Sequence, residues 1–346
     1  MINIDGIIYS LQSSGGISVY FDELIKEINK SCESSSVIVY PNNNHYAKEL
    51  EVTEKPRVNI AVERYLDVVV KGNNIKNDIF HSSYYRLPSN KKDFKIITTV
   101  HDFTYEIYPK GLKSKLHHWQ KRRAILNSDG IICISESTKK DLLHFIPEAK
   151  KIPIRVIYNG VGDFRPIENV SLDKNNVLFV GARDGYKNFH TCISALENHK
   201  DLTLVAVGGG KFNESELAIL NKTLPGRFRH AGFITEEELN KYYSSAFCLI
   251  YPSLYEGFGI PVIEAMKSGC PVIASNSSSI KEIATDASIL LENIDSKKIN
   301  EALSSLHNSS LRKEIVEKGL NRAKSYSWSK MGTETIDFYD EIRESK

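Results

Sequence analysis

Short apolar runs alternate with amphipathic helical stretches along the whole chain, a pattern that predicts a parallel α/β architecture. In the first half the strand candidates are Ile2–Tyr9, Val37–Tyr40, Ile79–His81, Ile96–His101, Gly130–Ser135 and Arg155–Tyr158. In the second half they are Val177–Gly181, Leu202–Val207, Phe228–Gly232, Cys248–Pro252, Pro271–Ala274 and Ser288–Leu291. Helices are expected between the strands, for example over Glu236–Ala246 and Ile294–Leu306. Each half is therefore expected to form its own Rossmann-like, doubly wound parallel sheet.

The pattern breaks between Asn159 and Asn169, where Asn-Gly and Gly-Asp pairs, Pro166 and few apolar residues favour a linker. We place the domain boundary there, with an N-terminal lobe over residues 1–163 and a second lobe over residues 164–327. Parallel sheets of this kind bind ligands beyond the carboxyl ends of their strands. The chemistry is therefore expected in a cleft across which the two lobes face each other.

Composition agrees with a globular protein of two domains. The chain has 346 residues, of which 41% are hydrophobic and 25% charged, and no apolar run approaches the ~18 residues of a membrane span. The residues from Met1 to Asp5 show no basic and apolar leader pattern. The five cysteines are odd in number and far apart, and Cys133, Cys192 and Cys248 lie in apolar runs typical of reduced core thiols. A cytoplasmic protein is expected.

The net charge is small and unevenly distributed. It is +2 for the whole chain, with +5 on residues 1–160 and −3 on residues 161–346. Nucleic-acid binding normally needs a strongly basic domain, so no nucleic-acid partner is expected. The asymmetry favours two lobes with different ligands.

The densest candidate motif follows the strand Cys248–Pro252 and runs from Ser253 to Met266. Two glycines bracket an aromatic residue, and Pro261 favours the first turn of a helix whose free N–H groups suit a phosphate. Glu256 and Glu264 stand on either side of this turn and can accept hydrogen bonds from sugar hydroxyls. Without the glycines and the proline, two solvated glutamates would be the simpler interpretation.

Further candidates also follow strands. Arg183 and Lys187 flank a turn, where two cations can neutralise a diphosphate, although an exposed pair at a helix start is the plain alternative. His101 and Asp102 end an apolar run, and a lone histidine there is more often structural. Gly15-Gly16 allows either a simple turn or a phosphate-binding loop. Gly208-Gly209-Gly210 lacks the dinucleotide spacing and predicts a turn near a nucleotide.

As a set, these segments resemble the motifs of retaining glycosyltransferases of family GT4, which have the GT-B fold. The resemblance is carried by Glu256 to Glu264 as the E-x7-E signature, Gly15-Gly16, Thr99-Val100-His101-Asp102, Ile134-Ser135-Glu136-Ser137 and Val180 to Asn188. It covers nearly the whole chain. His-Asp together with Arg-x3-Lys-Asn is most similar to mannosyltransferases that build bacterial surface polysaccharide.

The resemblance implies a donor site in the second lobe, an acceptor site in the first, and a terminal helix over residues 328–346 that returns to the first lobe. It assigns catalysis to His101, Arg183, Lys187 and Glu256. It assigns donor binding to Gly15, Gly16, Asp102, Arg183, Lys187, Phe233, Ile234, Glu256, Gly257, Phe258, Gly259, Ile260 and Glu264. No metal or other cofactor is expected. The donor is a GDP-sugar or a UDP-sugar, with mannose favoured, and the acceptor is a polyprenyl-diphosphate-linked glycan.

One stretch is rich in basic residues. No acid lies between Glu106 and Asp129, whereas Lys110 to Arg123 carries six cations. A solvated helix face is the default interpretation. The alternative is a site for a lipid diphosphate or for the anionic surface at the inner face of the cytoplasmic membrane. Two other functions remain open for the whole chain: a GT-B-shaped nucleotide-sugar epimerase and a non-catalytic sugar-binding protein.

Overall fold

The computed structural model describes residues 1–31, 33–48, 50–71, 77–183 and 185–345. The chain divides into two compact units, one formed by Met1–Gly160 with Trp328–Lys346 and the other by Val161–Ser327. The first boundary falls just before the one placed at residue 163 from the sequence. None of the helices in the described ranges is long and apolar enough to cross a bilayer.

Unit 1 contains a six-stranded parallel sheet with the strand order β2-β1-β3-β4-β5-β6. The strands are β1 (Ile2–Asp5), β2 (Ser35–Ile38), β3 (Asp78–Ser82), β4 (Phe94–Val100), β5 (Gly130–Cys133) and β6 (Ile154–Val156). The central strands β1, β3 and β5 are buried throughout, which is why they read as continuous apolar runs. The first predicted strand is shorter than expected, because the chain turns into a helix at Ile8.

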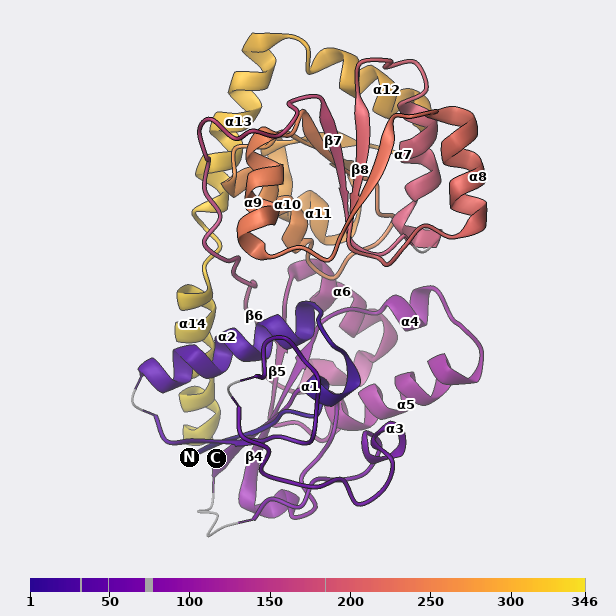
Figure 1. Ribbon diagram of the computed structural model, residues 1–346. Coiled ribbons are helices and arrows are strands. Elements are labelled where there is room, and N and C mark those ends of the chain that lie inside the picture. The colour runs from indigo at the N-terminus through magenta and orange to yellow at the C-terminus, as the bar shows by residue number, and fades with distance from the viewer. Residues whose placement is uncertain (32, 49, 72–76, 184, 346) are drawn as a thin grey trace. The chain divides into compact units, whose positions relative to one another are not determined.

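Seven α-helices accompany this sheet in the described part of unit 1. They are α1 (Ile8–Leu11), α2 (Gly16–Lys30), α3 (Ile60–Glu63), α4 (Thr104–Ile107), α5 (Leu112–Leu126), α6 (Glu136–Phe145) and the terminal α14 (Trp328–Glu344). Helix α14 lies beside α2 (Figure 1), and a Cβ at Gly332 would come within 2.3 Å of the Glu27 side chain. Nδ1 of His81 on β3 is 2.6 Å from the hydroxyl of Tyr339, which ties α14 to the sheet.

Unit 2 contains a second six-stranded parallel sheet, ordered β12-β11-β10-β7-β8-β9. Its strands are β7 (Asn176–Val180), β8 (Thr203–Val207), β9 (Phe228–Gly232), β10 (Cys248–Tyr251), β11 (Val272–Ser275) and β12 (Ile289–Leu291). Two six-stranded parallel sheets with flanking helices confirm the predicted α/β class.

The helices of unit 2 form two packed groups, α7 with α8 and α12, and α10 with α9, α11 and α13 (Figure 1). They are α7 (Phe189–Ala195), α8 (Glu214–Thr223), α9 (Glu236–Ser245), α10 (Ile260–Lys267), α11 (Ser278–Ala284), α12 (Ser296–Ser305) and α13 (Ser309–Ala323). Predicted helix 294–306 starts at Ser296, because the Asp295 side chain accepts the Lys298 N–H and caps it.

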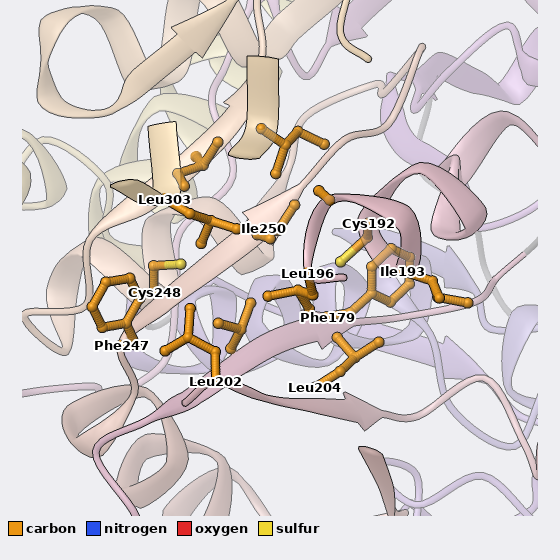
Figure 2. Packing of buried hydrophobic residues seen from close by; sticks show 14 of the residues in the cluster. Phe179, Cys192, Ile193, Leu196, Leu202, Leu204, Phe247, Cys248, Ile250 and Leu303 are labelled. Atoms are coloured by element: carbon orange, nitrogen blue, oxygen red, sulfur yellow. The ribbon is translucent and has the colours of Figure 1, made fainter. Parts of the chain in front are cut away.

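One hydrophobic core of unit 2 lies between the sheet and the first helix group. Figure 2 shows Phe179 and Leu204 from the sheet packed with Ile193 of α7, Leu196 directly after α7, and Leu303 of α12. The predicted core thiols Cys133, Cys192 and Cys248 are buried and free, and so is Cys270. Cys32 lies outside the described residues. This packed core fixes the strand ends that carry the candidate site.

Candidate active site

The loop between β10 and α10 carries the E-x7-E segment. Gly259 caps the start of α10 with a φ of 108°, and a Cβ there would lie 2.5 Å from the Ile280 side chain. Only glycine fits both the left-handed backbone and this close approach. Ile260 opens the helix, Pro261 next to it has no N–H, and the N–H of Val262 donates to the carbonyl of Gly259 at 3.0 Å, so the N–H of Ile260 is the one left without a helical acceptor in this first turn. The helix start can therefore bind an anion.

Two serines at the start of α11 hold this loop. The N–H of Glu256 donates to Oγ of Ser278 at 2.9 Å, and the hydroxyl of Ser279 donates to the carbonyls of Glu256 and Phe258 at 2.8 Å each. Ser278 has a φ of 44°, a strained value for a residue with a side chain. The sequence shows only a serine cluster typical of a turn here, so this positioning role was missed.

The side chains of Lys187 and Glu256 form an ion pair. The Lys187 ammonium lies 2.5 Å from Oε1 of Glu256, and both side chains are largely buried. The N–H of Leu254 donates to the carbonyl of Tyr186 at 2.8 Å, which joins the two loops through their backbones. Glu256 also accepts from the hydroxyl of Tyr251, whose pKa is raised well above its usual range by burial and by the glutamate.

Arg183 has a different environment from the one expected. Its side chain is 4% exposed, its Nε donates to Glu216 at 2.8 Å, and it also donates to the carbonyls of Gly208, Gly210 and Lys211. Burial favours the protonated carboxyl of Glu216, but the hydrogen bonds from Arg183 and from a backbone N–H hold its pKa below the ordinary range. The sequence predicted that Arg183 and Lys187 together can neutralise a diphosphate, with an exposed pair at a helix start as the alternative. In the structure the guanidinium of Arg183 is bonded to Glu216 and to the carbonyls of a loop.

That loop is the triple-glycine turn after β8. All three glycines have positive φ, between 69° and 75°. A Cβ at Gly209 would lie 2.6 Å from the carbonyl oxygen of Gly181 and 2.8 Å from Nη1 of Arg183. The segment is a tight turn built around the guanidinium, and Arg183 determines the shape of this edge of the sheet.

Glu264 lies on α10, one turn into the helix. Its Oε2 accepts from the hydroxyl of Tyr243 at 3.1 Å. Burial raises the pKa of Glu264 to about 7, the Tyr243 hydrogen bond opposes the shift, and the charge of Glu236 adds to it. Protonation of this carboxyl therefore changes near neutral pH, a sensitivity that the sequence did not indicate.

Phe233 and Ile234, the expected contacts of the nucleotide base, link β9 to α9. Phe233 is 69% exposed, and Thr235 after them caps α9 by accepting from the N–H of Glu238. The other candidate residues of unit 2 also lie in connections that follow strands, except Ile260 and Glu264, which lie on α10. Such positions bind ligands in parallel α/β sheets.

The remaining candidates lie in unit 1. Gly15 and Gly16 begin α2, with the Ser18 hydroxyl bonded to the carbonyl of Gly15. His101 follows β4 with its Nε2 buried and without a partner among the described residues, and burial lowers its pKa to about 4. Asp102 accepts from the N–H of Thr104. His101 is therefore a neutral imidazole at physiological pH.

The basic stretch from Lys110 to Arg123 does not form the continuous cationic surface that its sequence suggests. Helix α5 buries polar residues, and Lys121 is 0% exposed, with its ammonium 2.9 Å from Oε2 of Glu106. Arg122 pairs with Glu148, and Arg123 pairs with Asp67. The missing acids are supplied by Glu106 at the edge of the stretch and by Glu148 and Asp67 farther away along the chain, so membrane contact through Lys121, Arg122 and Arg123 is not supported. The outward residues of α5 include Leu112, Lys113, Lys115, Leu116 and Trp119.

Comparison with known proteins agrees with this architecture. Residues 14–163 match the family described as Glycosyltransferase Family 4, and residues 162–322 match Glycosyl transferases group 1. The O-antigen chain mannosyltransferase B of Escherichia coli is 25% identical over 287 residues, which cover 76% of this chain and 74% of that protein.

Solved structures share the fold. Sucrose-phosphate synthase from Thermosynechococcus elongatus superposes with a TM-score of 0.78 at 19% identity, over 99% of this chain and 98% of that one. WaaG, a glycosyltransferase involved in lipopolysaccharide biosynthesis, superposes with a TM-score of 0.70 at 17% identity, over 98% and 99%. The two parallel sheets and their strand-end loops define a GT-B protein. The chain belongs to the GT4-type glycosyltransferases.

Proposed function

We propose that this glycosyltransferase moves a hexosyl group from a nucleotide sugar to a hydroxyl of a growing glycan with retention of the anomeric configuration. Unit 2 binds the donor and unit 1 binds the acceptor. The observation that carries the proposal is the Lys187–Glu256 pair beside the open helix start of α10, because it combines a cation, a backbone donor and a carboxylate in connected loops.

In the proposed reaction the bond between the anomeric carbon and the β-phosphate oxygen breaks. The electron pair leaves with the nucleoside diphosphate, and the acceptor oxygen bonds to the anomeric carbon from the same face. The acceptor proton passes to the departing phosphate oxygen. Lys187 and the free N–H of Ile260 at the start of α10 stabilise the charge that grows on this oxygen.

The carboxylates and histidine orient the donor in this proposal. Glu256 accepts from the hydroxyls of the transferred sugar rather than attacking its anomeric carbon. Glu264 accepts from the ribose, and His101 contacts the transferred sugar. Arg183 supports the site through the glycine turn, since its hydrogen bonds to Gly208, Gly210 and Lys211 fix the backbone there. The leaving-group charge is met by protein groups, so no divalent metal is needed.

A GDP-sugar donor, with mannose as the transferred sugar, is the first choice to test, and a UDP-sugar is the second. The E. coli relative is named an O-antigen mannosyltransferase, and WaaG is a glycosyltransferase involved in lipopolysaccharide biosynthesis. By analogy we propose a polyprenyl-diphosphate-linked glycan as the acceptor, used at the inner face of the cytoplasmic membrane.

The corresponding membrane contact is proposed through the outward face of α5 and not through its buried cations. Leu112 is 81% exposed, Trp119 52% and Leu116 43%, and Lys113 and Lys115 are exposed beside them. An apolar stripe with flanking lysines fits the interface of an anionic bilayer.

The deciding experiment incubates the protein with radiolabelled GDP-mannose or UDP-sugars, with and without lipid-linked glycan. A transferase labels the acceptor and at most slowly hydrolyses the donor alone. An epimerase converts the donor without any acceptor, and a sugar-binding protein leaves the donor unchanged. Either of these last two results would reject the proposed function.

A further inference from the structure

Four elements of unit 1 bring aromatic and polar side chains together around the imidazole of His117 on α5. The ring of His117 lies 5.7 Å from Tyr84, 5.6 Å from Tyr85 and 4.4 Å from Tyr105, centroid to centroid. Tyr84 and Tyr85 follow β3, and Tyr105 follows its neighbour β4 on helix α4. We call these residues, with Arg64 after α3, the His117 cluster. It lies at the carboxyl ends of two adjacent strands, where parallel sheets bind ligands.

The guanidinium of Arg64 has a hydrogen-bond donor without an acceptor in the described structure. Its Cζ lies 4.1 Å above the centroid of the Tyr84 ring, and it donates to the Tyr84 hydroxyl. Its Nε is buried and has no acceptor among the described residues, and Arg64 forms no ion pair with any carboxylate of the described chain. A buried N–H donor without an acceptor is costly, so a ligand oxygen at this position would be stabilising.

The imidazole of His117 has a second polar atom without a hydrogen-bond partner in the described ranges. The residue is 7% exposed, and its buried Nδ1 has no hydrogen-bond partner in the described part of the chain. Burial, with the charges of Lys121 and Arg64, lowers the pKa of His117 to about 3. The ring is therefore neutral, with one donor and one acceptor nitrogen. A hydroxyl group, which both donates and accepts, fits either tautomer.

Charge in the cluster favours a neutral ligand over an anion. Lys121 is compensated by Glu106 at 2.9 Å, and the negative charge of Asp102 acts on His117 as well. A phosphate would gain from Arg64 but would be repelled by both carboxylates. A polyhydroxyl ligand meets no such repulsion. The Tyr105 side chain is 40% exposed and offers a flat apolar surface for a sugar ring.

We propose that the His117 cluster is a saccharide subsite for the acceptor glycan. One neutral sugar ring lies against the exposed face of Tyr105. On binding, the side chains of Arg64 and His117 turn so that Nε and Nδ1, buried without partners among the described residues, meet the sugar hydroxyls. The hydroxyl of Tyr85 is hydrogen-bonded to the backbone of His101, which links the subsite to the expected contact of the transferred sugar. Tyr85 has a strained φ of 54°, as residues at ligand sites often do. That the ligand belongs to an acceptor rests on the proposed function.

The test follows the imidazole resonance of His117 by NMR in the full-length protein, assigned with His117→Gln. The probes are methyl glycosides of mannose, glucose, galactose, rhamnose and N-acetylglucosamine, with inorganic diphosphate as the anionic arm. We expect a saturable shift with at least one glycoside. Its affinity should fall about tenfold or more in Tyr105→Ala and in Arg64→Gln. Val52→Ala, which shortens an exposed apolar side chain elsewhere in unit 1, is the control and should keep the shift.

Three results overturn the subsite: no shift with any glycoside, unchanged affinity in both cluster variants, or a shift with diphosphate alone, which would make the cluster an anion site. Failure of the proposed function is seen separately, with labelled nucleotide sugars. Turnover without glycoside binding at His117 rejects the subsite alone. Glycoside binding without any use of nucleotide sugars rejects the proposed function alone.

Discussion

The ammonium of Lys187 lies 2.5 Å from Oε1 of Glu256, so the two charged groups at this edge of the unit 2 sheet compensate each other directly. Glu256 is also held by Tyr251 and by Ser278, which fixes the carboxylate as well as the cation. A diphosphate would compete with Glu256 for the ammonium. The pair therefore couples phosphate binding to the position of the carboxylate that we propose contacts the sugar.

Substitutions in this pair should affect binding and transfer differently. Lys187→Ala should lower turnover by about 10²–10³, because a charge contact that strengthens as the leaving group departs is lost. Glu256→Gln should also lower turnover, yet it frees the ammonium, so affinity for the bare nucleoside diphosphate should be retained or increased. Calorimetric titration and steady-state kinetics measure the two effects.

Lys222 on α8 is exposed, and Lys222→Ala is the control for the loss of a positive charge. This variant should change neither turnover nor the affinity for nucleoside diphosphate. Wild-type turnover in Lys187→Ala would remove this residue from the mechanism. A covalent sugar trapped on Glu256 would make it a nucleophile and contradict the proposed orienting role.

Arg183 and Glu216 should behave as one unit. If the guanidinium acts by holding the glycine turn, Arg183→Ala and Glu216→Ala should lower turnover by similar factors, and the double variant should be little worse than either. The double-mutant cycle on kcat/KM measures this coupling. A loss in Arg183→Ala far larger than in Glu216→Ala would instead show that Arg183 contacts the phosphates itself.

Nucleotide affinity should rise with pH through about 7, because a carboxylate accepts ribose hydroxyls better than a carboxyl and Glu264 has its pKa raised to about 7. Two neighbours face this carboxyl. The hydrogen bond from Tyr243 opposes the rise in the pKa of Glu264, and the charge of Glu236 reinforces it. Titration of nucleotide affinity from pH 6 to 8 tests this. Glu264→Gln should bind more weakly and lose this rise, and an unchanged pH profile in that variant would exclude Glu264 as its source.

Deprotonation of Glu264 should raise nucleotide affinity but lower the stability of the fold. The folded-state pKa of Glu264 lies above the ordinary 4.5, so the folded protein binds the proton more tightly than the unfolded chain does. Its contribution to stability is complete below pH 4.5 and is lost as the pH rises through about 7. Chemical denaturation of wild type and Glu264→Gln across this range should show a smaller pH-dependent loss in the variant.

Membrane binding should depend on the outward residues of α5. The double variant Leu112→Glu, Trp119→Glu should lose most sedimentation with vesicles containing anionic phosphatidylglycerol, because both changes put charge on the apolar stripe. Leu217→Glu, at an exposed leucine of unit 2, is the control. Equal sedimentation of the double variant and the wild type would assign α5 to a solvated surface.

Transfer should continue in excess EDTA, since we propose that Lys187 and the free N–H of Ile260 meet the diphosphate charge. Initial rates with and without the chelator test this. Among the described residues no three His, Cys, Asp or Glu side chains are arranged to hold a metal ion. Complete loss of activity, restored by Mg²⁺ or Mn²⁺, would contradict the proposed mechanism.

The sequence by itself determined the class of the fold, the parallel strands and the E-x7-E loop. Buried parallel strands must be continuous apolar runs, and a helix start such as Gly259-Ile260-Pro261 has a local signature, so both can be predicted from neighbouring residues. The clustering of candidate residues beyond strand ends follows from the same local pattern.

Only the tertiary structure decided which carboxylate compensates each cation. Arg183 and Lys187 look equivalent in sequence, but Glu216 on a separate helix engages the first, whereas Glu256 in the candidate loop pairs with the second. Lys121 looked like a surface cation until the fold brought Glu106 to it. Electrostatic partners are chosen by distance in space and by burial, and neither quantity is encoded in the spacing of residues along a chain.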